Sequence, residues 1–82
     1  MTWTATWEPR ALDEAAGHLT QDPTDVRALL AATDRLADGP AIEGARPWGA
    51  QHYRLHRGPW RVLYRVDHAA ATIHIEHIGR NG

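Results

Sequence analysis

Basic side chains that could bind an anion are concentrated in one short stretch, residues 53–66, with the sequence YRLHRGPWRVLYRV. They are Arg54, His56, Arg57, Arg61 and Arg65. Guanidinium groups form bidentate hydrogen bonds with phosphate or carboxylate, so such a cluster suits an anionic ligand. The same residues could instead be the solvated face of a sheet, for which arginine is a common choice. How the stretch folds decides between these interpretations.

Alternation along two strands separates the charged side chains from the apolar ones. Strands over 52–57 and 60–67 are predicted to be joined by a turn at Gly58-Pro59, where glycine can adopt positive φ. Successive side chains of a strand point to opposite faces. One face then presents Arg54, His56, Arg61 and Arg65, and the other buries Tyr53, Leu55, Trp60, Val62 and Tyr64. Clustered guanidinium groups repel one another and have few acids nearby in sequence, which favours an anionic ligand.

The elements that position this hairpin follow from sequence periodicity and turn signals. Residues 2–7, TWTATW, alternate as a half-buried strand does. Helical spacing predicts a first helix over about 9–19, and Asp22-Pro23 begins a second that Gly39-Pro40 ends. Residues 40–50 are predicted to be an irregular connection, with Trp48 anchored on the core, and residues 72–78 a third strand after the hairpin. The order β-α-α-β-β-β predicts an α+β fold: a two-helix hairpin packed on one face of a mainly antiparallel four-stranded sheet.

Length and composition limit the classes of protein that fit. At 82 residues the chain is expected to be a single domain, residues 1–82, with little stability to spare, so a binding partner or self-association is plausible. It has no cysteine, which excludes disulfides and thiolate metal sites and fits a reducing compartment. No apolar run approaches the length of a membrane span and no secretion signal is evident, so we expect a cytoplasmic protein without membrane contact.

Charge is distributed unevenly along the chain. The formal net charge of −1 argues by itself against a nucleic-acid binder. Residues 1–50, however, hold eight acidic and four basic side chains, whereas residues 51–82 hold five arginines, two acids and five of the six histidines. All nine basic residues are arginine, which a GC-rich genome would also produce. The second part of the chain is therefore locally basic.

These residues resemble a known family. YRLHRGPWRVLYRVD, followed by TIHIEHIG, resembles the RelE/ParE superfamily of bacterial toxins, in its RelE-like branch. In that family a Y-R-x-R-x-G-x-[YW]-R-[VL]-[LI]-Y hairpin precedes a strand that ends near G-H-R. The resemblance extends over nearly the whole chain and implies the β-α-α-β-β-β fold already expected. It also implies the toxin of a type II toxin–antitoxin system, held inactive by a cognate antitoxin.

The RelE branch cleaves mRNA in the ribosomal A site without a metal, so the resemblance implies a ribosome-dependent endoribonuclease with no cofactor. The ribose 2′-OH attacks the adjacent phosphate, which requires a base, cations for the phosphorane and an acid for the leaving 5′-oxygen. Arg61 matches the phosphate-stabilising arginine of the family, and His56 could act as base or acid, because an unperturbed imidazole titrates near neutral pH. The predicted catalytic residues are Arg54, His56, Arg61 and Arg80, and the predicted RNA contacts are Arg57, Arg65 and His77.

The C-terminal signature departs from the family pattern. Where the family has G-H-R followed by a tyrosine, this sequence reads Gly79-Arg80-Asn81-Gly82. Arg80 stands where the family often has His or Lys, Asn81 stands where it has a catalytic arginine, and the tyrosine is not found. Catalysis is expected to be impaired unless Arg80 or His77 substitutes. Two alternatives stay open: a ParE-like inhibitor of DNA gyrase, which needs no acid–base residues, and a relic that only binds antitoxin.

Two other groups of polar residues could carry chemistry. His74 and His77 lie three apart on a strand, so they are predicted to point to opposite faces and not to share a zinc ion. Asp13 and Glu14 are adjacent on the first helix and are predicted to be solvated surface. We predict no metal and no other cofactor. The predicted partners are a cognate antitoxin and mRNA on the ribosome; a homodimer or a toxin–antitoxin hetero-oligomer is compatible with the sequence.

Overall fold

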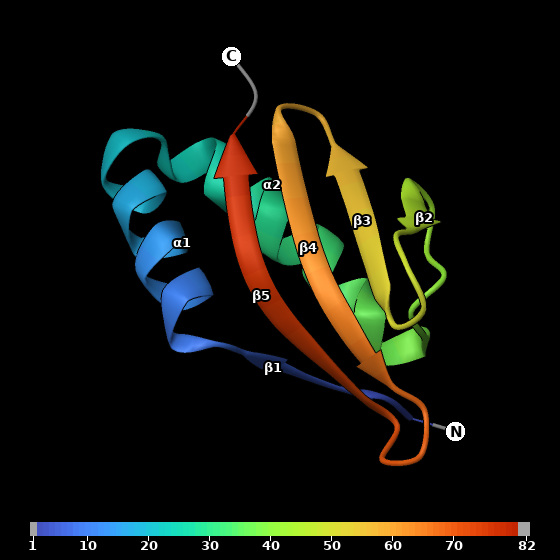
Figure 1. The fold of residues 1–82 in the computed structure, drawn as a ribbon. Helices are drawn as coiled ribbons and strands as arrows, with labels where there is room; N and C mark the ends of the chain where they lie inside the picture. The colour runs from blue at the N-terminus through green and yellow to red at the C-terminus, as the bar shows by residue number, and fades with distance from the viewer. Residues whose placement is uncertain (1, 81–82) are drawn as a thin grey trace.

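A mixed five-stranded sheet with two helices against one of its faces makes up the fold (Figure 1). The structure is a computed structural model that describes residues 2–80. Its strands are β1 (Thr4–Trp7), β2 (Ala45–Pro47), β3 (His52–Arg57), β4 (Trp60–Asp67) and β5 (Thr72–Arg80). Its helices are α1 (Pro9–Gln21), α2 (Pro23–Asp34) and the short 3-10 helix η1 (Arg35–Asp38). Among these helices, none is long and apolar enough to cross a membrane.

The predicted α+β class and the order of the main elements are confirmed, but the predicted number of strands is wrong. Residues 40–50 were expected to be irregular throughout, and Ala45–Pro47 instead forms β2, which pairs antiparallel with β3. Three residues are too few for alternation to reveal a strand. β2 therefore owes its conformation to pairing with β3 and not to a pattern of its own.

The first and last strands of the described chain lie side by side in the sheet. The strand order is β1-β5-β4-β3-β2, with β1 parallel to β5 and the other pairs antiparallel. β1 pairs only with residues 72–75 of β5. Beyond that point α1 runs beside β5, as Figure 1 shows at the left of the sheet. The second half of β5 is thus bordered by a helix and not by a strand.

The core lies between the helices and one face of the sheet. Helix α2 and η1 supply the buried residues Val26, Leu29, Ala32 and Leu36, and the central strands supply Trp60, Val62, Tyr64, Ile73, Ile75 and Ile78. The Trp60 indole N–H donates to the Asp25 carbonyl at 3.0 Å, and the Tyr64 hydroxyl donates to the Pro40 carbonyl. These two bonds join the sheet to α2 and to the segment after η1, so the largest side chains of β4 fix where the helical layer sits.

Replacing Trp60 with phenylalanine should lower the free energy of unfolding by about 1–3 kcal/mol, because the change removes buried volume and the bond to the Asp25 carbonyl. Denaturant unfolding followed by circular dichroism measures the loss. Trp48→Phe is the matched control: Trp48 is exposed, so its replacement should change stability by less than about 0.5 kcal/mol. Equal effects of the two substitutions would contradict this description of the core.

Candidate functional site

A groove of about 470 Å³ lies on the open face of the sheet. Its lining comes from β3, β4 and β5 and from the loop after β2: Trp48, Arg54, Arg61, Val62, Leu63, His77, Gly79 and Arg80. The helices cover the other face, so this one stays accessible (Figure 1). Four of the seven predicted site residues, Arg54, Arg61, His77 and Arg80, border this groove.

Strand register puts the basic residues of the hairpin where alternation predicted them. Arg54 pairs with Leu63 and His56 pairs with Arg61, all on the open face, whereas Leu55 and Val62 pair on the buried face. The predicted division of the hairpin into a buried and a presented set is confirmed. Among residues 2–80, neither Arg54 nor Arg61 forms an ion pair with an acidic side chain. Their charges are therefore available to a ligand.

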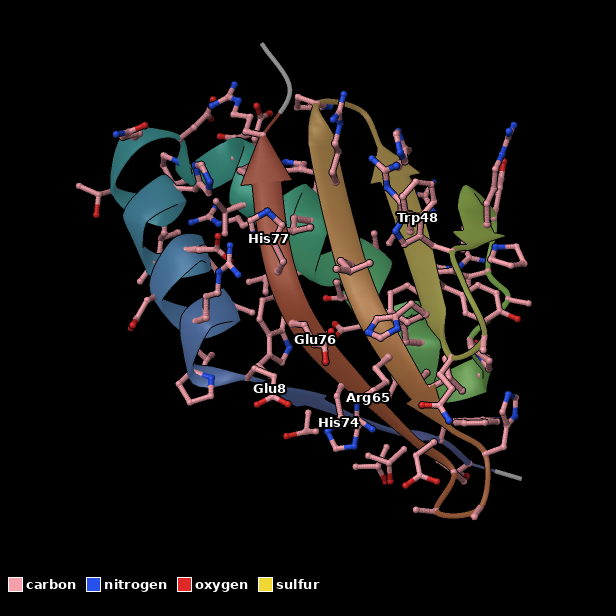
Figure 2. The ribbon with its side chains drawn as sticks, in the orientation of Figure 1. Glu8, Trp48, Arg65, His74, Glu76 and His77 are labelled. Atoms are coloured by element: carbon pink, nitrogen blue, oxygen red, sulfur yellow. The ribbon has the colours of Figure 1, made fainter. Side chains whose placement is uncertain are left out.

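Trp48 borders the groove and does not anchor the connection to the core. The prediction that it would do so is wrong, because the side chain is 57% exposed. The Arg54 guanidinium carbon lies 4.5 Å from the centre of the Trp48 ring. This cation–π contact orients the guanidinium without neutralising its charge. Figure 2 shows the indole standing over the upper part of β3.

His56 lies beside the groove and does not border it. It lines a neighbouring hollow of about 320 Å³ together with Arg46, Pro47, Trp48 and Arg54. Trp48 and Arg54 line both the groove and this hollow, so the stacked pair lies between the two. The side chain of His56 is exposed and lines a further hollow with Gly44 and Arg46.

Arg65 lies at the opposite end of the open face from the groove. Its Nε is 3.4 Å from one carboxylate oxygen of Glu76, and His52 Nε2 is 2.9 Å from the other. Nearby, His74 Nδ1 is 3.8 Å from a Glu8 carboxylate oxygen. Figure 2 shows Glu8, Arg65, His74 and Glu76 grouped on the lower half of the sheet, apart from His77. An RNA contact by Arg65 would therefore be remote from the groove and would compete with Glu76.

Arg57 lies on the face that the helices cover. It pairs with Trp60 and lines a shallow hollow with residues of α2 and with Arg35. Its Nε is buried and has no hydrogen-bond partner among the residues that the structure describes. Any RNA contact that it makes lies outside the groove.

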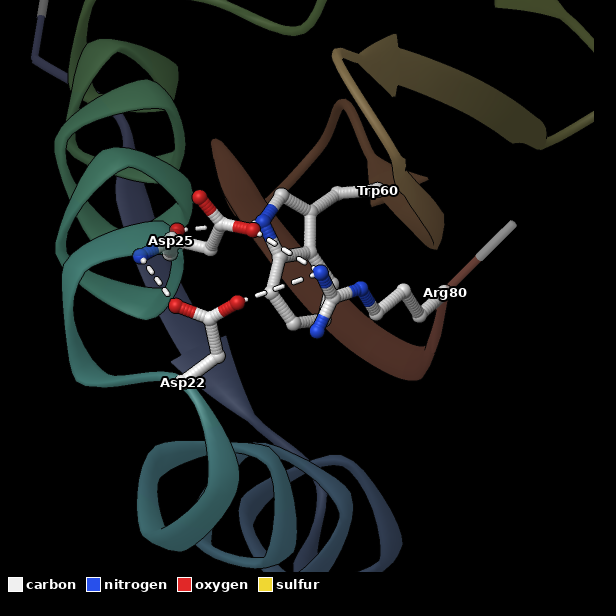
Figure 3. Close-up of polar contacts among 4 residues, drawn as sticks. All are labelled: Asp22, Asp25, Trp60 and Arg80. Carbon is white, nitrogen blue, oxygen red and sulfur yellow. Dashed lines mark hydrogen bonds and ion pairs between the residues drawn. The ribbon is translucent and has the colours of Figure 1, made fainter. Parts of the chain in front are cut away.

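Arg80 borders the groove, but its guanidinium is held by acids of the helical layer (Figure 3). Nη2 donates to Asp22 Oδ2 at 3.1 Å and to Asp25 Oδ2 at 3.0 Å, and the guanidinium carbon lies 5.6 Å from the centre of the Trp60 ring. Two carboxylates neutralise this arginine, so its predicted catalytic role would require it to leave them. Asn81, which was expected to stand in place of a catalytic arginine, lies outside the described residues.

A bulge in β5 places His77 on the open face. Leu63 pairs with His77 but the next residue, Tyr64, pairs with Ile75, so Glu76 is an extra residue between them. The prediction that His74 and His77 point to opposite faces is wrong, because this insertion reverses the alternation after Glu76. Within residues 2–80, no three or more His, Asp or Glu side chains are arranged to hold a metal ion.

Sequence reasoning missed Glu14 as a member of the site. The prediction that Glu14 is solvated surface is wrong: Oε1 accepts the Ile78 N–H at 3.0 Å, and Oε2 lies 2.7 Å from His77 Nδ1. The bulge and this contact both depend on which strand or helix lies beside β5. An amphipathic helix with two adjacent acids gives no sign of such a neighbour.

Comparisons with known proteins agree with this fold. The family model described as the ParE toxin of the type II toxin–antitoxin system parDE matches residues 6–82. No curated protein sequence matches the chain. The isolated RelE toxin of E. coli superposes with a TM-score of 0.79 at 18% identity, over 98% of this chain and 85% of that one.

Two solved complexes are similar as well. The archaeal RelE–RelB complex from Pyrococcus horikoshii has a TM-score of 0.77 at 20% identity, over 100% of this chain and 98% of that one. The toxin–antitoxin complex RelBE2 from Mycobacterium tuberculosis has a TM-score of 0.70 at 22% identity, over 99% of this chain and 100% of that one. At these identities the structures show a shared fold.

Stability should depend on the ionisation of Asp22. The pKa of this carboxyl is lowered, chiefly because the Asp25 backbone N–H donates to it and also because Arg80 does. Because the pKa of Asp22 is lower in the folded chain than in the unfolded chain, its ionised carboxylate stabilises the fold. The full contribution is present at pH values well above the ordinary pKa of 3.8. This contribution is lost as the pH falls through the lowered value.

The Asp22→Asn variant lacks this contribution. We expect its Tm to be below that of the unmodified chain at pH 7, and the difference to narrow below about pH 4. Thermal unfolding followed by circular dichroism between pH 7 and pH 2 measures it. A difference that stays constant over this range would contradict the expectation.

Proposed function

This chain belongs to the ParE toxin family of type II toxin–antitoxin systems, within the RelE/ParE superfamily, and on that premise we propose that it is a ribosome-dependent mRNA endoribonuclease. The groove on the open face supports the proposal most directly, because two arginines without acidic partners among residues 2–80 meet there beside an imidazole and an indole. We place its action in the cytoplasm, where translated mRNA is found.

The groove has the chemical features of a site for single-stranded RNA. Arg54 and Arg61 supply planar donors that match phosphate oxygens. Trp48 presents an exposed ring beside them, and unpaired bases stack on aromatic side chains. A free carboxylate ligand would use the arginines but not the indole. The combination therefore favours a nucleotide over a simple acid.

The reaction that fits such a site is an internal transfer of phosphate. The 2′-oxygen of ribose attacks the adjacent phosphorus, the O2′–P bond forms, and the P–O5′ bond breaks. The products are a 2′,3′-cyclic phosphate and a free 5′-hydroxyl. Negative charge increases on the phosphate oxygens in the transition state, and fixed guanidinium groups stabilise it. Arg61 is placed for this task because it lies on the central strand β4, opposite Gly79 of β5, with no bulky side chain between.

We further propose that a cognate antitoxin controls the protein. The RelE proteins of the solved complexes are bound to RelB, and this chain shares their fold, which supports the proposal. An antitoxin that covers the groove with acidic side chains would neutralise Arg54 and Arg61 and exclude RNA. A homodimer or a toxin–antitoxin hetero-oligomer is compatible with this mode of control.

Replacing Arg61 with alanine should relieve growth arrest on expression and reduce mRNA cleavage on programmed ribosomes by about 100-fold or more, since a group that stabilises the transition state is lost. Arg27→Ala is the matched control, because Arg27 is exposed on α2 in the helical layer and its loss changes the net charge equally. Circular dichroism should show both variants folded. Full cleavage by the Arg61→Ala protein would remove this site from the reaction.

A second function, inhibition of DNA gyrase, is favoured by two observations: the matching family model describes a ParE toxin, and acids of the helical layer occupy Arg80. A binder needs no acid–base group, so Arg54 and Arg61 would then contact protein or DNA. Supercoiling by purified gyrase separates the two functions. Inhibition of gyrase with mRNA left intact on translating ribosomes would replace the nuclease proposal.

A further inference from the structure

The bulge in β5 gives His77 an orientation that regular alternation would deny it. If the residues after Ile75 alternated regularly, His77 would point into the core; because Glu76 is an extra residue opposite β4, the His77 side chain lies on the open face and is 40% exposed. Bulges are common next to active sites, where they direct a side chain that the pleat would turn away. Figure 2 shows the result: His77 on the upper half of β5, on the same face as Trp48.

Glu14 fixes the imidazole from the neighbouring helix. One carboxylate oxygen accepts the Ile78 N–H on the β5 edge that β1 leaves unpaired, and the other lies 2.7 Å from His77 Nδ1. Arg10, one turn earlier on α1, has its Nε 3.8 Å from the same carboxylate oxygen. Glu14 is 24% exposed, so its contacts are partly shielded from water. The carboxylate is therefore held at two points of β5, residues 77 and 78.

This contact determines which nitrogen of His77 carries the proton. At 2.7 Å two unprotonated acceptors would repel each other, so Nδ1 is the protonated nitrogen of the neutral ring. Nδ1 is buried and 2.7 Å from Glu14 Oε2, although the angle between them is not that of a hydrogen bond. Nε2 is then the nitrogen with a free lone pair. In hydrolytic triads, a carboxylate beside Nδ1 likewise keeps the proton on Nδ1 and the lone pair on Nε2.

Nε2 lies on the groove side of the ring, near Arg61. A Cβ added at Gly79 would be 3.5 Å from His77 Nε2, and Gly79 pairs with Arg61 across β4 and β5. His77 and Gly79 both line the groove. The bare backbone of Gly79 thus leaves a path between the lone pair and the guanidinium. By contrast, His56 lines the neighbouring hollow, where no described carboxylate contacts it.

We propose that His77 is the general base of the RNA cleavage and that Glu14 is the residue that positions it; this rests on the proposed nuclease function. Nε2 takes the proton of the 2′-OH as the O2′–P bond forms, and Glu14 stabilises the resulting imidazolium. The P–O5′ bond breaks and the 5′-oxygen takes a proton from water in the open groove. His77 then returns its proton to the hydroxide left behind, so the side chains end as they began. The proton transfer from the 2′-OH thus uses only side chains that the structure describes, His77 and Glu14.

Single-turnover cleavage of mRNA on programmed ribosomes, at saturating toxin, tests the assignment. The His77→Ala variant should lose about 100-fold or more in rate, and Glu14→Gln about tenfold to 100-fold. Glutamine keeps an oxygen to accept the Ile78 N–H, so the β5 edge stays capped. His74→Ala is the matched control: His74 lies on the same strand and face and is also near a glutamate, Glu8, but away from the groove. The His74→Ala variant should cleave mRNA at the rate of the unmodified protein.

A double-mutant cycle separates positioning from support of the fold. In the His77→Ala background, adding Glu14→Gln should cost no further rate, because Glu14 acts through the imidazole. Added imidazole should partly restore cleavage by His77→Ala and not by Arg61→Ala. If Glu14→Gln lowers the rate equally with and without His77, the carboxylate only supports β5. Should His77→Ala fail to fold, His77→Gln replaces it in the rate measurement.

The outcomes for the two proposals are distinct. If the unmodified protein cleaves mRNA and Arg61→Ala does not, while His77→Ala cleaves normally, the nuclease function stands and the assignment of His77 is wrong. Loss of activity in His56→Gln together with an active His77→Ala would give the base role to His56. Ribosome binding by the unmodified protein without any cleavage overturns both proposals.

Discussion

Two short helices can cover only one face of a five-stranded sheet, and the organisation of this protein follows from that limit. The covered face takes the large apolar side chains of β4 and β5 except Leu63, with Trp60 and Tyr64 hydrogen-bonded to backbone carbonyls of the covering segments. The other face must be polar, because water contacts it. Charged groups on such a face can be neutralised only by their own neighbours. One part of the open face has such acidic neighbours, and the other part does not.

The two ends of the open face differ in how their charges are balanced. At one end Glu76 and Glu8 lie close to Arg65, His52 and His74, so basic and acidic groups compensate one another. At the other end Arg54 and Arg61 have no acidic partner among residues 2–80. A net charge of −1 for the whole chain therefore hides a local excess of positive charge. The overall charge of a small protein is a poor guide to the polarity of one groove.

Features set by local sequence could be predicted, and features set by distant neighbours could not. The β3–β4 hairpin and the start of α2 at Asp22-Pro23 depend on alternation, a turn and a cap, all within a few residues. The bulge at Glu76 depends on how β5 pairs with β4, and no residue type within β5 predicts it. Glu14 caps the N–H of Ile78, which is 64 residues away in the chain. The site was thus predictable where strand parity decides it, at Arg54 and Arg61, and unpredictable where α1 and the bulge decide it.

The parallel pairing of β1 with β5 has a consequence for how the chain folds during synthesis. β5 is the last strand of the described chain to be made, yet it lies between β1 and β4. Until it leaves the ribosome, β1 has no strand to pair with, α1 has no strand to run beside, and the core lacks Ile73, Ile75 and Ile78. Contacts between segments so far apart in sequence make folding slow and cooperative. His77 and Gly79, which border the groove, belong to this last strand, so the groove is incomplete until β5 has joined the sheet.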